Sequence, residues 1–200
     1  MGSFIPALEQ NGYIDASKKI LEIEKSEQHH GISLAITATC CIKAAGGVEL
    51  STNLNKDIQK TARLFAGLEN GENALIEKAI ALAQPCVDLF YARSQCTPAE
   101  AQYFLGVTYG VERLANKNII PGEVRAFVRS GFYNLTLEQT EMGYLREHVE
   151  ECDGAEGWHE AYMKHIIDEL GDQSAYEGVL AIEQRTSDWY QNLYQFIVSL

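Results

Sequence analysis

The chain has 200 residues, of which 46% are hydrophobic and 22% charged, so it is long enough to bury a full core without disulfides. Sixteen basic residues against 28 acidic ones give a formal net charge of -12, which argues against nucleic acid or an anionic membrane as a partner. No apolar run reaches the length of a membrane-spanning helix, and the N-terminus lacks a basic stretch followed by an apolar one. We therefore expect a single cytoplasmic domain over residues 1–200 without membrane insertion.

The regular spacing of apolar residues predicts the secondary structure. Apolar side chains recur at intervals of three and four along nearly the whole chain, and no run of four residues alternates strictly. This pattern predicts an all-α protein, a single-domain bundle of about seven helices. In chain order, we expect helices over residues 15–45, 55–66, 72–94, 97–116, 121–152, 155–170 and 174–200.

Several helix ends carry local signals. Thr97-Pro98-Ala99-Glu100 combines an N-cap, a proline at the first helical position and a capping-box glutamate. Ser174-Ala175-Tyr176-Glu177 is a second capping box, and Gly171 is placed to close the preceding helix. Pro121 is expected to open a new helix, whereas the two glycines of Gly106-Val107-Thr108-Tyr109-Gly110 fall in mid-helix and indicate close helix packing.

The five cysteines are odd in number and show no Cys-x-x-Cys spacing. This pattern is typical neither of a secreted disulfide framework nor of a structural zinc site. The adjacent Cys40 and Cys41 sit among Ala, Ile and Thr residues, and we interpret them as small core side chains.

Polar side chains on apolar helix faces are the candidates for function, because burying them costs free energy. At about 100° per residue, Glu27, Glu141, His159 and Glu183 each fall on the apolar stripe of a different predicted helix. Glu27-Gln28-His29-His30 and Glu156-Gly157-Trp158-His159 are both Glu-x-x-His sequences, which put the two side chains on one helix face. Helical bundles use such inward carboxylates and imidazoles to hold paired iron or manganese. The same residues are also compatible with local helix pairs of no catalytic meaning.

A longer pattern adds a family resemblance. Within residues 111–190, a leucine-rich helix ends in the paired acids Glu150-Glu151 and is followed by a turn with Gly154. The next helix has His159 near its start and is closed by Leu170-Gly171. This order resembles the heme-oxygenase-like superfamily, which includes thiaminase II, pyrroloquinoline-quinone synthase and the heme-oxygenase-like di-iron oxidases. The segment GVLAIEQRTSDWY is similar to the helix that carries a metal-binding glutamate in the di-iron branch, which gives Glu183 that role.

The resemblance implies a heme-oxygenase-like fold and an oxidoreductase that activates dioxygen at iron to transform a small organic substrate. The expected metal ligands are Glu27, His30, Glu141, Glu151, His159 and Glu183, and the expected substrate pocket is formed by Tyr144, Trp158, Tyr190 and Tyr194. Heme is the alternative cofactor, with His30 as its axial ligand, because heme oxygenases take that histidine from their first helix.

Two other functions fit the same sequence. The first is a metal-free helical protein that binds a small apolar molecule in an aromatic pocket. The second is an acidic, non-enzymatic interaction protein in which the inward Glu and His residues pair with one another and an apolar patch is exposed to a partner. The aromatic segment of residues 190–200 is either part of the core or the surface of a homodimer or of a complex with another protein.

Overall fold

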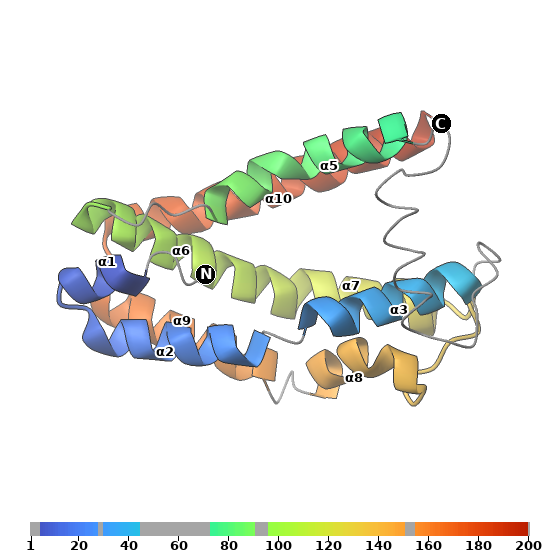
Figure 1. Cartoon of the computed structure of the whole chain (residues 1–200), viewed down its shortest axis with the longest axis horizontal. Coiled ribbons are helices and arrows are strands. Elements are labelled where there is room, and N and C mark those ends of the chain that lie inside the picture. The colour runs from blue at the N-terminus through green and yellow to red at the C-terminus, as the bar shows by residue number, and fades with distance from the viewer. Residues whose placement is uncertain (1–4, 28–29, 45–72, 91–95, 151–154, 200) are drawn as a thin grey trace. The chain divides into compact units, whose positions relative to one another are not determined.

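The computed structural model describes residues 5–27, 30–44, 73–90, 96–150 and 155–199, and every regular element in these ranges is helical (Figure 1). The α-helices are α1 (Ile5–Gln10), α2 (Ile14–Glu27), α3 (His30–Ala44), α5 (Asn73–Val87), α6 (Pro98–Leu114), α7 (Ile120–Glu123), α8 (Gly143–Glu150), α9 (Ala155–Leu170) and α10 (Gln173–Val198). Short 3-10 turns cover Asp88–Phe90 and Thr140–Met142, and π-helical segments cover Ala115–Ile119 and Val124–Arg129. The all-α prediction is confirmed for these residues, while the heme-oxygenase-like arrangement stays a prediction.

The start of α6 and the end of α9 follow their sequence signals. The Thr97 hydroxyl accepts a hydrogen bond from the Glu100 amide at 3.2 Å, and the Glu100 carboxylate accepts one from the Thr97 amide at 2.7 Å, which completes the capping box. α9 ends at Leu170, where the Gly171 amide donates to the Ile167 carbonyl at 2.8 Å. Both signals act within four residues, so the local sequence is sufficient to place them.

The predicted cap of α10 is wrong by two residues. The helix begins at Gln173, and Asp172 is the residue that caps it. Its Oδ1 atom accepts hydrogen bonds from the amides of Ser174 at 2.7 Å and Ala175 at 3.3 Å. An aspartate is as good an N-cap as serine, and its negative charge also interacts favourably with the positive end of the helix dipole.

The predicted helix boundaries around Pro121 are also wrong. Helical backbone runs without interruption from Pro98 to Arg129, with a π-helical segment directly before α7. The wider π turn accommodates the missing backbone donor of Pro121, so this proline does not separate two helices. The break comes instead at residues 130–139, where Gly131 has a φ of 68° and Asn134 a φ of 51°.

For the other expected helices, the described residues cover only part of the expected range. The helix predicted over residues 15–45 is described as α2 and α3, with residues 28 and 29 between them outside the described part of the chain. α5 continues through Pro85 to Val87, and the helix predicted over residues 55–66 lies entirely outside the described residues.

The chain divides into two compact units, and each draws on separate stretches of sequence. Unit 1 comprises residues 1–26, 78–115 and 158–200, and unit 2 comprises residues 27–77 and 116–157. The prediction of one domain over residues 1–200 stays a prediction. The core of unit 1 is formed by α1, α2, α6 and α9 through Leu8, Ala16, Ile20, Ile23, Ala101, Leu105, Met163 and Ile166. The core of unit 2 contains Cys41, Ile120, Val124, Leu135, Met142 and Leu145.

Glycines allow α6 and α10 of unit 1 to pack closely against each other (Figure 1). A Cβ atom built on Gly106 would lie 1.8 Å from the Ala175 carbonyl oxygen, and one on Gly178 would lie 2.0 Å from the Tyr103 carbonyl oxygen. The backbones therefore approach each other at distances that only glycine permits. The close packing predicted from the Gly106–Gly110 spacing is confirmed.

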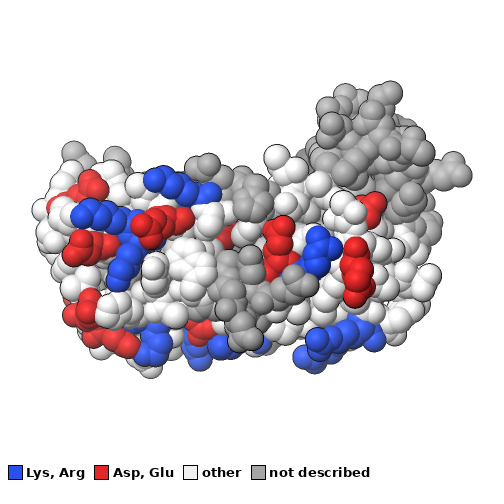
Figure 2. Space-filling model, turned by 90° about the horizontal axis from the view of Figure 1, so that it is seen from below, with Lys and Arg blue, Asp and Glu red and all other residues white. Residues whose placement is uncertain are grey.

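The surface carries mixed charge. On the face shown in Figure 2, the basic and acidic side chains of the described residues are interspersed and do not gather into a field of one sign. Among the helices in the described ranges, none is both long and apolar enough to cross a lipid bilayer.

Candidate functional site

His159 of α9 is fully buried in unit 1. Its imidazole has no exposed surface, its Nε2 atom lies 2.9 Å from the Ser26 hydroxyl, and its Nδ1 atom lies 3.6 Å from a carboxylate oxygen of Glu112. Glu112 itself is 3% exposed. The inward direction predicted for His159 is confirmed, and its surroundings are a hydroxyl and a carboxylate within the unit 1 core.

The Ser26–His159–Glu112 cluster has the connectivity of a nucleophilic triad, but its hydrogen-bond directions do not suit that chemistry. The Ser26 hydroxyl is 2.8 Å from the Ile23 carbonyl, an atom that only accepts hydrogen bonds. Ser26 therefore donates to Ile23 and accepts from the Nε2–H of His159, which leaves the imidazole unable to remove the serine proton. The cluster places buried polar groups side by side, and in this arrangement the serine is not activated as a nucleophile.

Glu183 lies on α10 and pairs with an arginine. Its carboxylate forms a hydrogen-bonded ion pair with Arg113 of α6, and both side chains are partly exposed. Glu183 thus lies at the edge of the α6–α10 contact, where it accepts from a guanidinium group that would compete with a metal cation for the same oxygens.

Unit 2 contains a second polar cluster around two histidines, His30 beside Glu27 and His148 near Glu123. Glu27 and His30 pair at the i,i+3 spacing through Oε2 and Nδ1. The His30 ring lies 4.5 Å from that of His148, whose Nδ1–H donates to the Tyr144 carbonyl at 2.6 Å. The Glu-x-x-His sequence predicted at Glu27 and His30 therefore does bring these two side chains together.

Burial in unit 2 favours the neutral forms of a carboxyl and a thiol. Burial raises the pKa of the Glu123 carboxyl, and the nearby His148 opposes this rise. Burial, helped by the neighbouring Cys40 and by Glu123, raises the pKa of the Cys41 thiol to about 11. Cys40 and Cys41 are both free thiols, so their interpretation as small core side chains agrees with their position.

We expect Cys41 to resist iodoacetamide in the native protein at pH 8. With a pKa of about 11, only about one thiol in a thousand is present as the reactive thiolate at this pH. Labelling should accelerate about tenfold per pH unit up to pH 11, and peptide mass mapping measures it directly. The control is the same protein in urea, where Cys41 should label like an ordinary cysteine. Complete labelling of native Cys41 within minutes at pH 8 would contradict the burial described above.

One of the predicted ligands is exposed, and another lies outside the described residues. Glu141 is exposed because the helix expected over residues 121–152 is broken before it, so the stripe that put it on the apolar face does not exist. Its backbone carbonyl instead accepts a hydrogen bond from the Thr37 hydroxyl at 2.8 Å. Glu151 and the side chain of Glu156 lie outside the described residues.

The four aromatic residues predicted to line a substrate pocket are divided between the two units. Trp158 packs on the unit 1 core with its ring 4.3 Å from that of His159. Tyr144 belongs to unit 2, where it lies beside His148. Tyr190 and Tyr194 are 46% and 70% exposed on α10. Of the two alternatives given for the C-terminal aromatic segment, the core alternative is therefore wrong for these two tyrosines.

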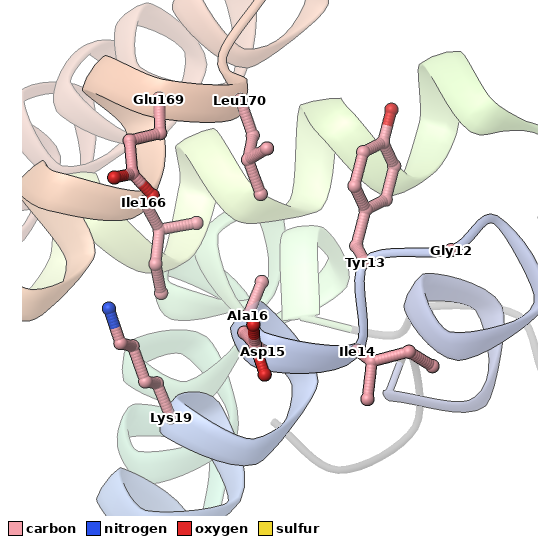
Figure 3. A pocket seen from close by; sticks show the side chains of 9 residues that line it. All are labelled: Gly12, Tyr13, Ile14, Asp15, Ala16, Lys19, Ile166, Glu169 and Leu170. Atoms are coloured by element: carbon pink, nitrogen blue, oxygen red, sulfur yellow. The ribbon is translucent and has the colours of Figure 1, made fainter.

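A pocket of about 160 Å³ lies in unit 1, between the start of α2 and the end of α9 (Figure 3). Ile166, Glu169 and Leu170 of α9 face Ala16 and Lys19 of α2 across it. Cavities that enclose an organic ligand measure roughly 300–1,000 Å³, so this one is smaller than a typical binding site. None of the predicted ligands or pocket aromatics lines it.

Five of the six predicted metal ligands lie among the residues that the structure describes. Among these residues, no three His, Cys, Asp or Glu side chains are placed to hold one metal ion. Glu27, His30 and Glu141 belong to unit 2, whereas His159 and Glu183 belong to unit 1. The iron and heme centres stay predictions.

Sequence reasoning missed Glu112, Arg113 and Glu123 as members of these clusters. Glu112 had a usable signal, because it follows the buried Leu105 and Thr108 at intervals of three and four along α6. Arg113 gave no such signal, because arginines are common on helix surfaces beside buried positions.

Comparison of the chain with protein-family models, with curated proteins and with solved structures gave no match. The resemblance to the heme-oxygenase-like superfamily therefore stays an expectation from the sequence.

Proposed function

We propose that the chain is a non-enzymatic interaction protein that binds another helix through one exposed face of α10. The observation that carries this proposal is a row of large apolar side chains in contact with solvent. Tyr176, Leu180, Tyr194 and Val198 are between 46% and 70% exposed. At about 100° per residue they lie within about 40° of one another, and we name these four residues the α10 face.

The α10 face points away from the side of α10 that packs against α6 within unit 1, and Glu183, which pairs with Arg113 of α6, lies at the border between the two. Ala175, Val179 and Ile182 are buried, and the glycine contacts place them on the side of α10 that meets α6. The helix thus carries buried apolar residues on one face and exposed apolar residues on another. Apolar surface that a fold does not need for its own core is typical of a protein interaction site.

The pairing of the inward polar groups also supports an interaction protein. Glu27 pairs with His30, His159 lies against Glu112, and Glu183 pairs with Arg113. Each group thus has a partner from its own unit. This agrees with the non-enzymatic alternative, in which inward Glu and His residues stabilise the fold.

Photo-crosslinking tests the proposal. Benzoylphenylalanine in place of Tyr194 should give one discrete crosslinked species in extracts of native cells, with the bound peptide identified by mass spectrometry as part of a helix. The same probe at Asn192, which is exposed on the other side of α10, is the matched control and should give none. Leu180→Glu in the probe-bearing chain should abolish the crosslink, because it places a charge on the same face.

Two results would contradict the proposal. Equal crosslinking from positions 194 and 192 would show that position 194 is merely accessible. A large loss of thermal stability in Leu180→Glu would show that the α10 face packs inside the chain, since substitutions of exposed residues change stability by only about 0.5 kcal/mol.

A further inference from the structure

We infer that the helix bound by the α10 face is α10 of a second copy of this chain, packed antiparallel about a two-fold axis at Ser187. This inference rests on the interaction function proposed above and names its partner. It is carried by the spacing of the exposed residues along the helix.

The spacing of the α10 face is symmetric about Ser187. Leu180 and Tyr194 lie seven residues to either side of it, and Tyr176 and Val198 lie eleven residues to either side. Two copies that cross antiparallel at Ser187 therefore place Leu180 against Tyr194 of the second copy. They also place Tyr176 against Val198. A two-fold contact requires this reciprocity: if a residue of one copy contacts a given residue of the second, the same pair must also form with the two copies exchanged.

The residue at the centre allows close approach. Ser187 is exposed and points to the same side of α10 as the four apolar residues, since seven- and eleven-residue steps both return close to one helix face. Its small side chain lets two helix backbones come together where they cross, while larger side chains pack on either side. The four apolar residues span about 33 Å of helix at about 1.5 Å per residue, as two pairs on either side of the polar stretch around Ser187.

The charge beside the α10 face also favours a second copy. A two-fold axis brings the flank of one helix against the same flank of its partner, so like charges there would repel. One flank is formed mainly by uncharged glutamines, and Gln184 comes near Gln191 of the second copy. The exposed residues of this flank are Gln173, Glu177, Gln184, Gln191 and Gln195. On the other flank, Glu183 is paired with Arg113 of its own unit, so its charge is already compensated.

The expected dimer is reversible and responds to salt. Its contact involves only four large apolar side chains from each copy, which places it among the smaller interfaces, those of transient complexes. Each copy carries a net charge of -12, so salt should strengthen association by screening the repulsion between them. Tyr194→Glu should raise the dissociation constant at least about 100-fold, because the substitution occurs twice in each dimer.

Cysteine crosslinking of the full chain tests the register. Ser187→Cys should form a covalent dimer with a short bis-maleimide, whereas wild type and Asn192→Cys should not. Leu180→Cys and Tyr194→Cys should crosslink when the two variants are mixed and not when each is alone, because equivalent positions lie about 21 Å apart along the pair. Sedimentation velocity at two salt concentrations measures the dissociation constants of wild type and Tyr194→Glu.

The outcomes separate this inference from the function on which it rests. A chain that stays monomeric at about 100 μM in high salt, together with a crosslink from position 194 to a helix of another protein, overturns the two-fold dimer and keeps the interaction function. A monomer that gives no crosslink from position 194 overturns both. A dimer in which Ser187→Cys and Asn192→Cys crosslink equally also overturns the register proposed here.

Discussion

Replacing Gly178 with alanine is expected to lower the free energy of unfolding by about 3 kcal/mol, because the added methyl group has no space in the contact with α6. Its Cβ atom would lie 2.0 Å from the Tyr103 carbonyl oxygen and 2.9 Å from the Val107 nitrogen. Both atoms belong to the backbone, so no side-chain rotation relieves the clash and the two helices must move apart. Urea denaturation followed by far-ultraviolet circular dichroism measures the loss.

Gly122→Ala is the matched control for this variant. Gly122 also lies in a helix, but a Cβ atom there has no neighbour within 4 Å. Alanine favours helix over glycine by about 1 kcal/mol, so this variant should be as stable as wild type or more stable. If Gly178→Ala were equally stable, α6 and α10 would not approach each other as closely as the structure describes.

The second large effect is expected at His159. His159→Gln should cost about 3 kcal/mol of stability in metal-free protein, because it removes the imidazole that lies between the Ser26 hydroxyl and the buried Glu112 carboxylate. Glutamine has no ring to fill the same space beside both groups, and it loses the ring contact with Trp158. A chelator in the denaturation experiment ensures that the loss comes from the fold and not from a bound metal.

His165→Gln in the same helix is the control. His165 lies 3.2 Å from Glu169 at the i,i+4 spacing, but these side chains are 53% and 58% exposed, so water replaces whatever the pair loses. We expect a change within about 0.5 kcal/mol. Equal effects of the two substitutions would mean that burial of His159 contributes nothing. A chain that binds iron and loses it in His159→Gln, with unchanged stability, would instead support the metal-centre hypothesis.

The helical wheel predicted the direction of side chains correctly on some helices and wrongly on others. The helical wheel placed His159 inward correctly because α9 is one uninterrupted helix from Ala155 to Leu170. It placed Glu141 inward wrongly because residues 130–139 are not helical, and every residue after the break loses its angular relation to those before it. A periodicity argument therefore holds only as far as the helix on which it depends.

Which groups meet was harder to predict than which groups point inward. The sequence suggested that inward carboxylates and imidazoles from four helices share one metal site. In the structure, Glu183 meets Arg113 and Glu27 meets His30, while His159 meets Glu112. Each carboxylate was inward or partly buried for the ordinary reason that a nearby cationic or hydrogen-bonding side chain compensates its burial.

The sequence by itself determined the helical class, the capping box at Thr97, the end of α9 at Gly171 and the close packing at Gly106, because each depends on residues within a few positions or on the size of one side chain. Only the tertiary structure decided that Glu183 pairs with Arg113, 70 positions away, and that His159 meets Ser26, 133 positions away. It also decided which of the two apolar faces of α10 is buried. Helix–helix packing brings together residues distant in sequence, and neither local propensity nor periodicity carries information about which helices meet.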